Sequence, residues 1–169
     1  MKNIVFKLMI TLFMVMIYSH FDTSVYAKKI EMTNKNFSLK ELKGKTSFNC
    51  FIPTDIAKDW NIELKHPEQV HKNMEKLQIH FLNRAGTQLK VAIIESTATG
   101  NDIQLGEHRE RVKINNINGV FHPLTPTKRI KDVKGGQLMW VQDGTMIELF
   151  SSRISKQELI TIAQSMQKL

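Results

Sequence analysis

The sequence contains a single cysteine, Cys50, among its 169 residues. One cysteine cannot form a disulfide within the chain, so packing and hydrogen bonds must stabilise the fold. Cys50 lies in the apolar run Phe48–Ile52, and this position favours a buried small hydrophobic side chain over a reactive thiol. No cysteine lies directly after the apolar segment near the N-terminus, so we expect no lipid attachment of the bacterial lipoprotein type.

Motifs of the common enzyme classes are missing as well. Ser96 has no glycine elbow around it, as a serine hydrolase would require. No glycine-rich loop leads into a helix as a phosphate site does. Three glutamates fall on predicted strands, but no spacing brings two of them together as glycosidase chemistry requires: Glu63, Glu95 and Glu148. We interpret Glu148 as part of the solvent face of an edge ribbon, and we predict no catalytic residues.

The histidines show no metal-binding pattern either. His66 and His71 are five residues apart with Glu68 between them, a spacing that matches neither a helix face nor a familiar zinc motif. We therefore interpret the histidines as surface residues and predict no metal and no cofactor. The enzymatic alternative is a hydrolase built from polar loop residues near His66 or His108.

The N-terminus has the features of an export signal. Two lysines precede the apolar run Leu8–Tyr18, which is too short for a comfortable membrane span, and small residues lead up to Ala27. We predict a signal peptide over residues 1–27 that is cleaved after Ala27, and a secreted, extracytoplasmic domain over residues 28–169. Without cleavage, the same segment would anchor the protein in the membrane.

The net charge is +8, and the lysines that produce it are scattered along the chain. A basic exported protein is suited to an anionic partner in the cell envelope, such as a polymer or lipid head groups. The alternative is that the charge only keeps the protein soluble. No basic stripe is interleaved with aromatic residues, and an exported chain has little access to nucleic acid, so we exclude nucleic acid as a partner.

The clearest structural pattern is a β-hairpin followed by a helix near the C-terminus. Gln137–Gln142 and Thr145–Phe150 are apolar-rich runs joined by Asp143-Gly144, a pair that favours a two-residue type I′ turn. This loop length places Trp140 opposite Ile147 on one face of the ribbon.

A capping box then opens a helix, because the Ser155 hydroxyl can accept from the Glu158 amide while Glu158 reaches back. The apolar residues Leu159, Ile162 and Met166 recur at helical spacing after it. The helix should pack this face on the Trp140 side of the ribbon.

Upstream residues predict further strands and turns. The segments expected are a capping box at Ser38–Glu41, a strand over Thr46–Ile52 ended by Pro53, a helical turn over Thr54–Trp60, a strand over Asn61–Lys65, a hairpin of Leu77–Leu82 with Leu89–Ser96, and a pair of Arg111–Asn115 with Val120–His122 turned at Asn118-Gly119. Together they predict an α+β domain. Its single curved antiparallel β-sheet would have about seven strands, with the C-terminal helix packed on one face, after the signal peptide.

The order of these segments resembles a known family. The runs that carry the resemblance are SLKEL, TSFNCFIPTDIAKDW, KLQIHFLN, LKVAIIES, VKINNINGVF and LMWVQDGTMIELFSSRISKQELITIAQSM. They are similar to domain of unknown function 4367, with the C-terminal run the most specific. The family's Pro-x-x-Leu-Pro-x-Gly-Tyr element corresponds here to Pro53–Trp60, where the second proline and the glycine are missing.

The resemblance implies an extracytoplasmic domain of bacilli and clostridia, often the outer part of anti-sigma-factor-like membrane proteins or of lipoproteins. It implies no catalytic residues. A more distant similarity to lipoprotein carriers and sigma-E regulators concerns the fold. We therefore expect a secreted, non-enzymatic binding or regulatory module of a Gram-positive envelope, with a protein or an anionic polymer as partner. The alternative is a carrier or sensor of a lipid or other apolar ligand held between the sheet and the helix.

Overall fold

The computed structural model describes residues 42, 44–65, 74–100, 103, 107–128 and 131–169. All of them belong to the second of two compact units of the chain, Thr33–Leu169. The predicted signal peptide with Ala27 and the capping box at Ser38–Glu41 lie outside the described residues. His66 and His71 lie outside them too.

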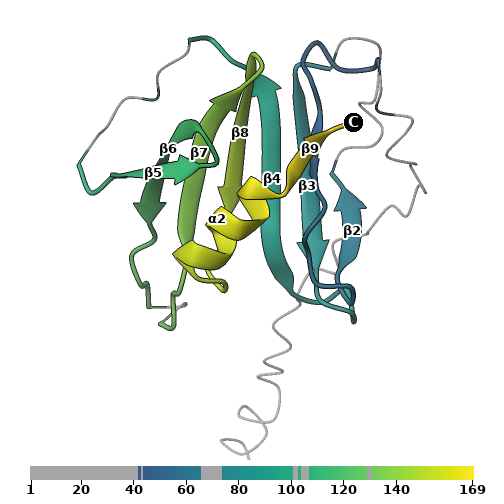
Figure 1. The fold of residues 1–169 in the computed structure, drawn as a ribbon. Coiled ribbons are helices and arrows are strands. Elements are labelled where there is room, and N and C mark those ends of the chain that lie inside the picture. Colours follow the sequence, from purple (N-terminus) through teal and green to yellow (C-terminus); the bar gives the residue numbers. More distant parts are fainter. Residues whose placement is uncertain (1–41, 43, 66–73, 101–102, 104–106, 129–130) are drawn as a thin grey trace, which may run out of the picture. The chain divides into compact units, whose positions relative to one another are not determined.

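The described part of the chain is mostly β, with a seven-stranded antiparallel sheet and one helix near the C-terminus (Figure 1). The strands have the spatial order β2-β3-β4-β8-β7-β6-β5, and a separate pair is formed by β1 and β9. The elements are β1 Phe51–Pro53, β2 Asn61–Leu64, β3 Lys76–Leu82, β4 Leu89–Thr97, β5 Glu110–Ile114, β6 Ile117–Pro123, β7 Gly136–Gln142, β8 Thr145–Phe150, α2 Lys156–Gln164 and β9 Met166–Lys168.

The β7–β8 hairpin has the predicted register. Asp143 and Gly144 adopt φ angles of 45° and 78°, the positive values that a type I′ turn requires at both positions. Trp140 pairs with Ile147 as a consequence. Both side chains are fully buried on the face of the sheet that carries the helix, which we call the inner face.

Helix α2 lies across the inner face, as Figure 1 shows. Its buried residues Leu159, Ile162 and Ala163 join the core that covers this face of the sheet. The predicted capping box is present, because the Glu158 amide donates to the Ser155 hydroxyl and the Glu158 carboxylate accepts from the Ser155 amide at 2.7 Å. The Ser155 backbone N–H, followed by its hydroxyl, holds the pKa of Glu158 below its usual value.

Loss of this cap should lower stability without changing the fold. Replacing Ser155 with alanine removes the acceptor for the Glu158 amide, so we expect a loss of about 1 kcal/mol in the free energy of unfolding. Urea denaturation followed by circular dichroism measures it. Ser152→Ala, four residues from the first helical position and without a capping contact, is the matched control; equal losses in both variants would contradict the assignment.

The C-terminal residues depart from the predicted helix. α2 ends at Gln164, and Met166–Lys168 form strand β9, which pairs with β1 in a second small sheet (Figure 1). The prediction of a single sheet was therefore wrong in part, because the chain also forms this second, two-stranded sheet. The strand predicted over Thr46–Ile52 was also misplaced, because β1 includes Pro53 instead of ending before it. Pro53 is tolerated at the last position of a short strand that has a ladder partner on one side.

Two predicted turns were wrong. The β5–β6 turn lies at Asn115-Asn116, where Asn115 has φ 51°, and not at Asn118-Gly119. Asparagine tolerates positive φ, whereas Gly119 is needed inside β6, where a Cβ would lie 2.9 Å from Ile114 Cδ1 and 3.0 Å from the Met139 carbonyl oxygen. Residues 54–60 form bends and a turn closed by the Trp60 amide instead of the expected helical turn.

Candidate functional site

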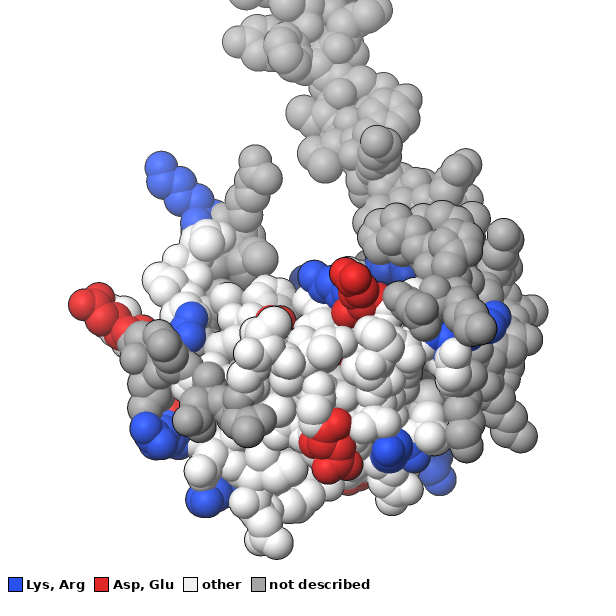
Figure 2. All heavy atoms as spheres, turned by 90° about the horizontal axis from the view of Figure 1, so that it is seen from above, with Lys and Arg blue, Asp and Glu red and all other residues white. Residues whose placement is uncertain are grey.

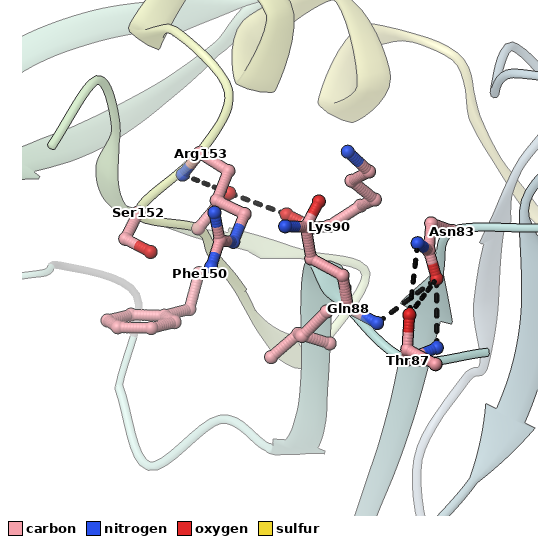
Figure 3. A pocket seen from close by; sticks show the side chains of 9 residues that line it. Asn83, Thr87, Gln88, Lys90, Phe150, Ser152 and Arg153 are labelled. Atoms are coloured by element: carbon pink, nitrogen blue, oxygen red, sulfur yellow. Dashed lines mark hydrogen bonds between the residues drawn. The ribbon is translucent and has the colours of Figure 1, made fainter. Parts of the chain in front are cut away.

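A pocket of about 470 Å³ lies where the β3–β4 turn approaches the segment between β8 and α2 (Figure 3). Two chain segments about sixty residues apart in the sequence form its walls. The lining residues are Asn83, Thr87, Gln88, Leu89, Lys90, Phe150, Ser151, Ser152 and Arg153.

The β3–β4 wall is fixed by one side chain. The Asn83 carboxamide oxygen accepts hydrogen bonds from the backbone amides of Thr87 at 2.9 Å and Gln88 at 3.0 Å. The backbone of the turn closes through the Asn83 amide and the Gln88 carbonyl, and Gly86 supplies the positive φ of 68°. This arrangement holds the backbone of Gln88 in place at the pocket wall.

The β8–α2 wall is fixed by Ser151 and Gly135. The Ser151 hydroxyl donates to the Lys90 carbonyl at 2.5 Å and accepts from the Arg153 amide at 3.0 Å, which ties the end of β8 to the start of β4. Gly135 passes so close that a Cβ there would lie 2.3 Å from the Ile154 carbonyl oxygen and 2.4 Å from that of Ser151. Hydrogen bonds and close backbone packing therefore hold both walls of the pocket.

The polar side chains that line the pocket leave several donors available. Within the described ranges, Gln88, Lys90, Ser152 and Arg153 have no side-chain hydrogen bond or ion pair. In Figure 3 the Arg153 side chain extends between Phe150 and Gln88, whereas the Lys90 ammonium points away from them. Phe150 is 38% exposed, and its ring provides a flat apolar surface at the pocket wall.

The composition of the lining limits the chemistry. None of these nine residues is a histidine, cysteine, aspartate or glutamate, so the pocket wall has no carboxylate or imidazole to act as a general base. The Ser151 hydroxyl already bonds three backbone groups and is not positioned as a nucleophile. The arrangement can hold an anion or a neutral polar group, with two cations adding positive potential.

Glu95 is the most unusual titratable residue outside the pocket. It lies on the inner face of β4, fully buried, and both carboxyl oxygens approach the Phe51 amide, at 3.0 and 3.3 Å. Burial raises the pKa of Glu95 to about 8, and the hydrogen bond from Phe51 opposes that shift only in part. Together with the hydrogen bond from the Thr145 hydroxyl to the Asn49 carbonyl at 2.9 Å, this contact fastens β1 to the sheet.

The other two predicted glutamates lie apart from Glu95, on the opposite, outer face of the sheet. Glu63 forms an ion pair with Lys65 at 3.2 Å, and Glu148 accepts from the Gln137 carboxamide at 2.6 Å. Glu148 is not on an edge ribbon as interpreted, because β8 lies between β4 and β7. The structure therefore brings none of the three carboxylates together.

Histidines in the described part of the chain are also separated. His80 is hydrogen-bonded to the Gln78 side chain at 2.8 Å, and burial, with a smaller effect of Lys65, lowers its pKa. His122 lies on β6, and His108 lies in the loop before β5 with φ 60°. Among the residues with a described position, no three His, Cys, Asp or Glu side chains form a group that could hold a metal ion.

Cys50 is buried, as its apolar sequence context predicted. Burial raises the pKa of its thiol, and the hydrogen bond with the Thr46 hydroxyl at 3.3 Å lowers it by less. A raised pKa keeps the sulfur protonated at neutral pH and therefore unreactive as a nucleophile.

On the face that Figure 2 shows, the basic side chains of the described residues do not gather on one patch. Figure 2 shows Lys and Arg side chains in several separate groups around the described residues. Some of the cations are paired within the fold; Lys156, for example, forms an ion pair with Glu110 and lies 5.4 Å above the Phe121 ring. A long helix for membrane insertion is not found among the described residues either.

No sequence pattern predicts the pocket. Arg153 lies two residues before the N-cap Ser155, and Lys90 is the second residue of a strand; neither position forms a motif with the other. Glu95 could have been found, because strict alternation places it on the same face as Val91 and Ile93.

Comparison with known protein families gives one match. The profile of the family described as a domain of unknown function, DUF4367, matches residues 50–166. The match covers more than half of the chain, so the protein belongs to this family. Its boundaries run from the residue before β1 to the first residue of β9. No curated protein and no solved structure matches the chain.

Proposed function

We propose that this protein is a secreted, non-enzymatic binding module of the bacterial cell envelope, and that its partner is anionic. The observation that carries the proposal is the pocket beside Arg153. It has fixed walls, two cations and unpaired donors, but no acidic or imidazole side chain in its lining. Such a site is suited to recognition, because the groups needed for proton transfer at neutral pH are missing from its wall.

The alternative of an apolar ligand between sheet and helix has less support. That space contains Leu138, Trp140 and Leu159, each with no exposed surface. A ligand there would have to displace well-packed core side chains, and each such displacement opposes the burial that stabilises the domain. The proposed export follows from the N-terminal sequence, with cleavage after Ala27.

Co-sedimentation with cell walls tests the proposed function. Purified protein of residues 28–169 should sediment with walls that retain their anionic polymers, and salt should release it because the attraction is electrostatic. Walls stripped of those polymers are the control and should bind much less. Equal binding to stripped and intact walls would overturn the proposal, as would substrate turnover by the purified domain.

Export is tested separately by expressing the full chain in a Gram-positive host. We expect the culture supernatant to contain a form whose N-terminal residue is Lys28. Changing Ala27 to a bulky residue should retain the protein at the membrane. Accumulation of the whole chain in the cell interior would contradict the proposed localisation.

A further inference from the structure

We propose that the pocket binds an anionic sugar, that is, a sugar ring bearing a phosphate or a carboxylate group. This inference rests on the proposed function and assigns a ligand class to its site. It combines three features of the pocket wall: a cation that has no ion pair with another described residue, a partly exposed aromatic ring, and neutral donors between them.

The Arg153 guanidinium is the group that holds the charge. Its side chain has no ion pair among the described residues, and Figure 3 shows it reaching into the space between Phe150 and Gln88. A guanidinium offers a planar set of donors that matches a phosphate or carboxylate with two parallel hydrogen bonds. Lys90, whose ammonium points away, adds to the positive potential without contacting the same group.

Phe150 provides the surface for the ring. It is the last residue of β8, and its backbone is fixed by pairing with both Ala92 and Gln137. At 38% exposure, its ring offers an apolar face while its position stays fixed. Burying this face against the C–H side of a sugar ring removes apolar surface from water on both partners.

Gln88 and Ser152 supply the neutral donors that sugar hydroxyls need. The Gln88 carboxamide can both donate and accept, and the Ser152 hydroxyl can do either. Neither side chain has a hydrogen bond within the part of the chain that the structure describes. The pocket volume of about 470 Å³ lies within the range of small-molecule sites and accommodates one or two sugar rings.

Calorimetric titration of the purified domain, residues 28–169, tests the assignment. The probes are glucose 6-phosphate, inorganic phosphate and glucose. We expect glucose 6-phosphate to bind about tenfold more tightly than inorganic phosphate, because the ring adds contact with Phe150, and glucose to bind more weakly than either. An order in which inorganic phosphate binds as tightly as glucose 6-phosphate would overturn the inference.

Two substitutions separate the contributions. Arg153→Ala should weaken glucose 6-phosphate and inorganic phosphate alike, by about tenfold or more. Phe150→Ala should remove the advantage of glucose 6-phosphate over inorganic phosphate and leave inorganic phosphate unchanged. Arg111→Ala, an exposed arginine on β5 outside the pocket, is the matched control and should bind both probes like the unmodified domain. If Arg111→Ala weakens binding as much as Arg153→Ala does, the attraction is a general charge effect and the inference fails.

The same variants distinguish the free sugar from a polymer unit. If Arg153→Ala no longer binds either glucose 6-phosphate or intact walls, the pocket binds a unit of the wall polymer. If the variant no longer binds glucose 6-phosphate but still binds walls, the pocket binds a soluble sugar and the walls bind another surface of the domain. Wall binding by the unmodified domain without any sugar-phosphate binding overturns the inference but leaves the proposed function intact. Sugar-phosphate binding without wall binding supports the ligand class of the pocket but overturns the proposed function. Thermal unfolding of each variant confirms that the fold is retained.

Discussion

Replacing Glu95 with glutamine should make the stability of the domain much less sensitive to pH. The folded state raises the pKa of Glu95 from 4.5 to about 8, so the folded protein binds a proton more tightly than the unfolded chain does. The stabilising effect is complete below pH 4.5 and is lost as the pH rises through 8. Each pH unit in this interval corresponds to about 1.4 kcal/mol, so the loss between pH 5 and pH 8 is on the order of 4 kcal/mol.

The measurement is the difference in unfolding free energy between the unmodified domain and Glu95→Gln, taken by urea denaturation at several pH values. Glutamine keeps a carbonyl oxygen for the Phe51 amide but carries no titrating proton. The free energy of unfolding of Glu95→Gln should therefore rise steadily relative to that of the unmodified domain from pH 5 to pH 8. Glu75→Gln, at an exposed position, is the control. Parallel pH profiles for the unmodified domain and Glu95→Gln would contradict the prediction.

Hydrogen exchange locates the same effect in the structure. Ionising Glu95 places a charge in the core, and the cost of burying it exceeds the gain from the stronger hydrogen bond with the Phe51 amide. After correction for the intrinsic dependence of exchange on pH, the protection of the Phe51 amide should therefore fall as the carboxyl ionises. Amides of the β7–β8 hairpin, whose partners are backbone carbonyls, should keep their protection over the same interval.

Replacing Gly135 with alanine should destabilise the domain strongly. A Cβ would lie 2.3 Å from the Ile154 carbonyl oxygen and 2.4 Å from that of Ser151, and both atoms belong to the backbone that positions Arg153. Because backbone atoms cannot rotate aside, the segment between β8 and α2 must move. We expect a loss of about 2–4 kcal/mol in the free energy of unfolding, measured by denaturant titration.

Gly100→Ala is the matched control, since nothing lies within 4 Å of a Cβ at that position. Its effect should stay within about 0.5 kcal/mol. At low denaturant, where the Gly135→Ala variant is still folded, its affinity for glucose 6-phosphate should also fall, because Arg153 moves with the displaced segment. A stable variant with unchanged affinity would show that the close approach of Gly135 does not position the pocket wall.

The parts of the fold that could be predicted depend on neighbouring residues. Asp143-Gly144 determines the register of β7 and β8 because both turn residues need positive φ, and Ser155 with Glu158 determines the start of α2 because the two groups satisfy each other's donors. Each signal acts within four residues. The hydrophobic alternation within β3 and β4 is similarly local, and it predicted the hairpin that these two strands form.

The parts that could not be predicted depend on distant residues. The pairing of β1 with β9 joins segments more than a hundred residues apart, and nothing in Met166–Lys168 distinguishes a strand from the end of a helix. Gly119 was interpreted as a turn residue because glycine favours turns, but its role is to leave room beside Ile114 and Met139. The pocket also could not be predicted, because Gln88 and Arg153 come together only when the β3–β4 turn and the end of β8 have folded.

The β1–β9 pair has a consequence for the order in which the domain folds. Phe51–Pro53 come early in the chain, but their partner Met166–Lys168 comes at its end. Contacts of such large sequence separation form late, since the intervening loop must close first. A chain delivered N-terminus first, by a ribosome or through a membrane channel, cannot complete this pairing until its last residues emerge. Final closure of the domain therefore cannot precede the emergence of Met166–Lys168.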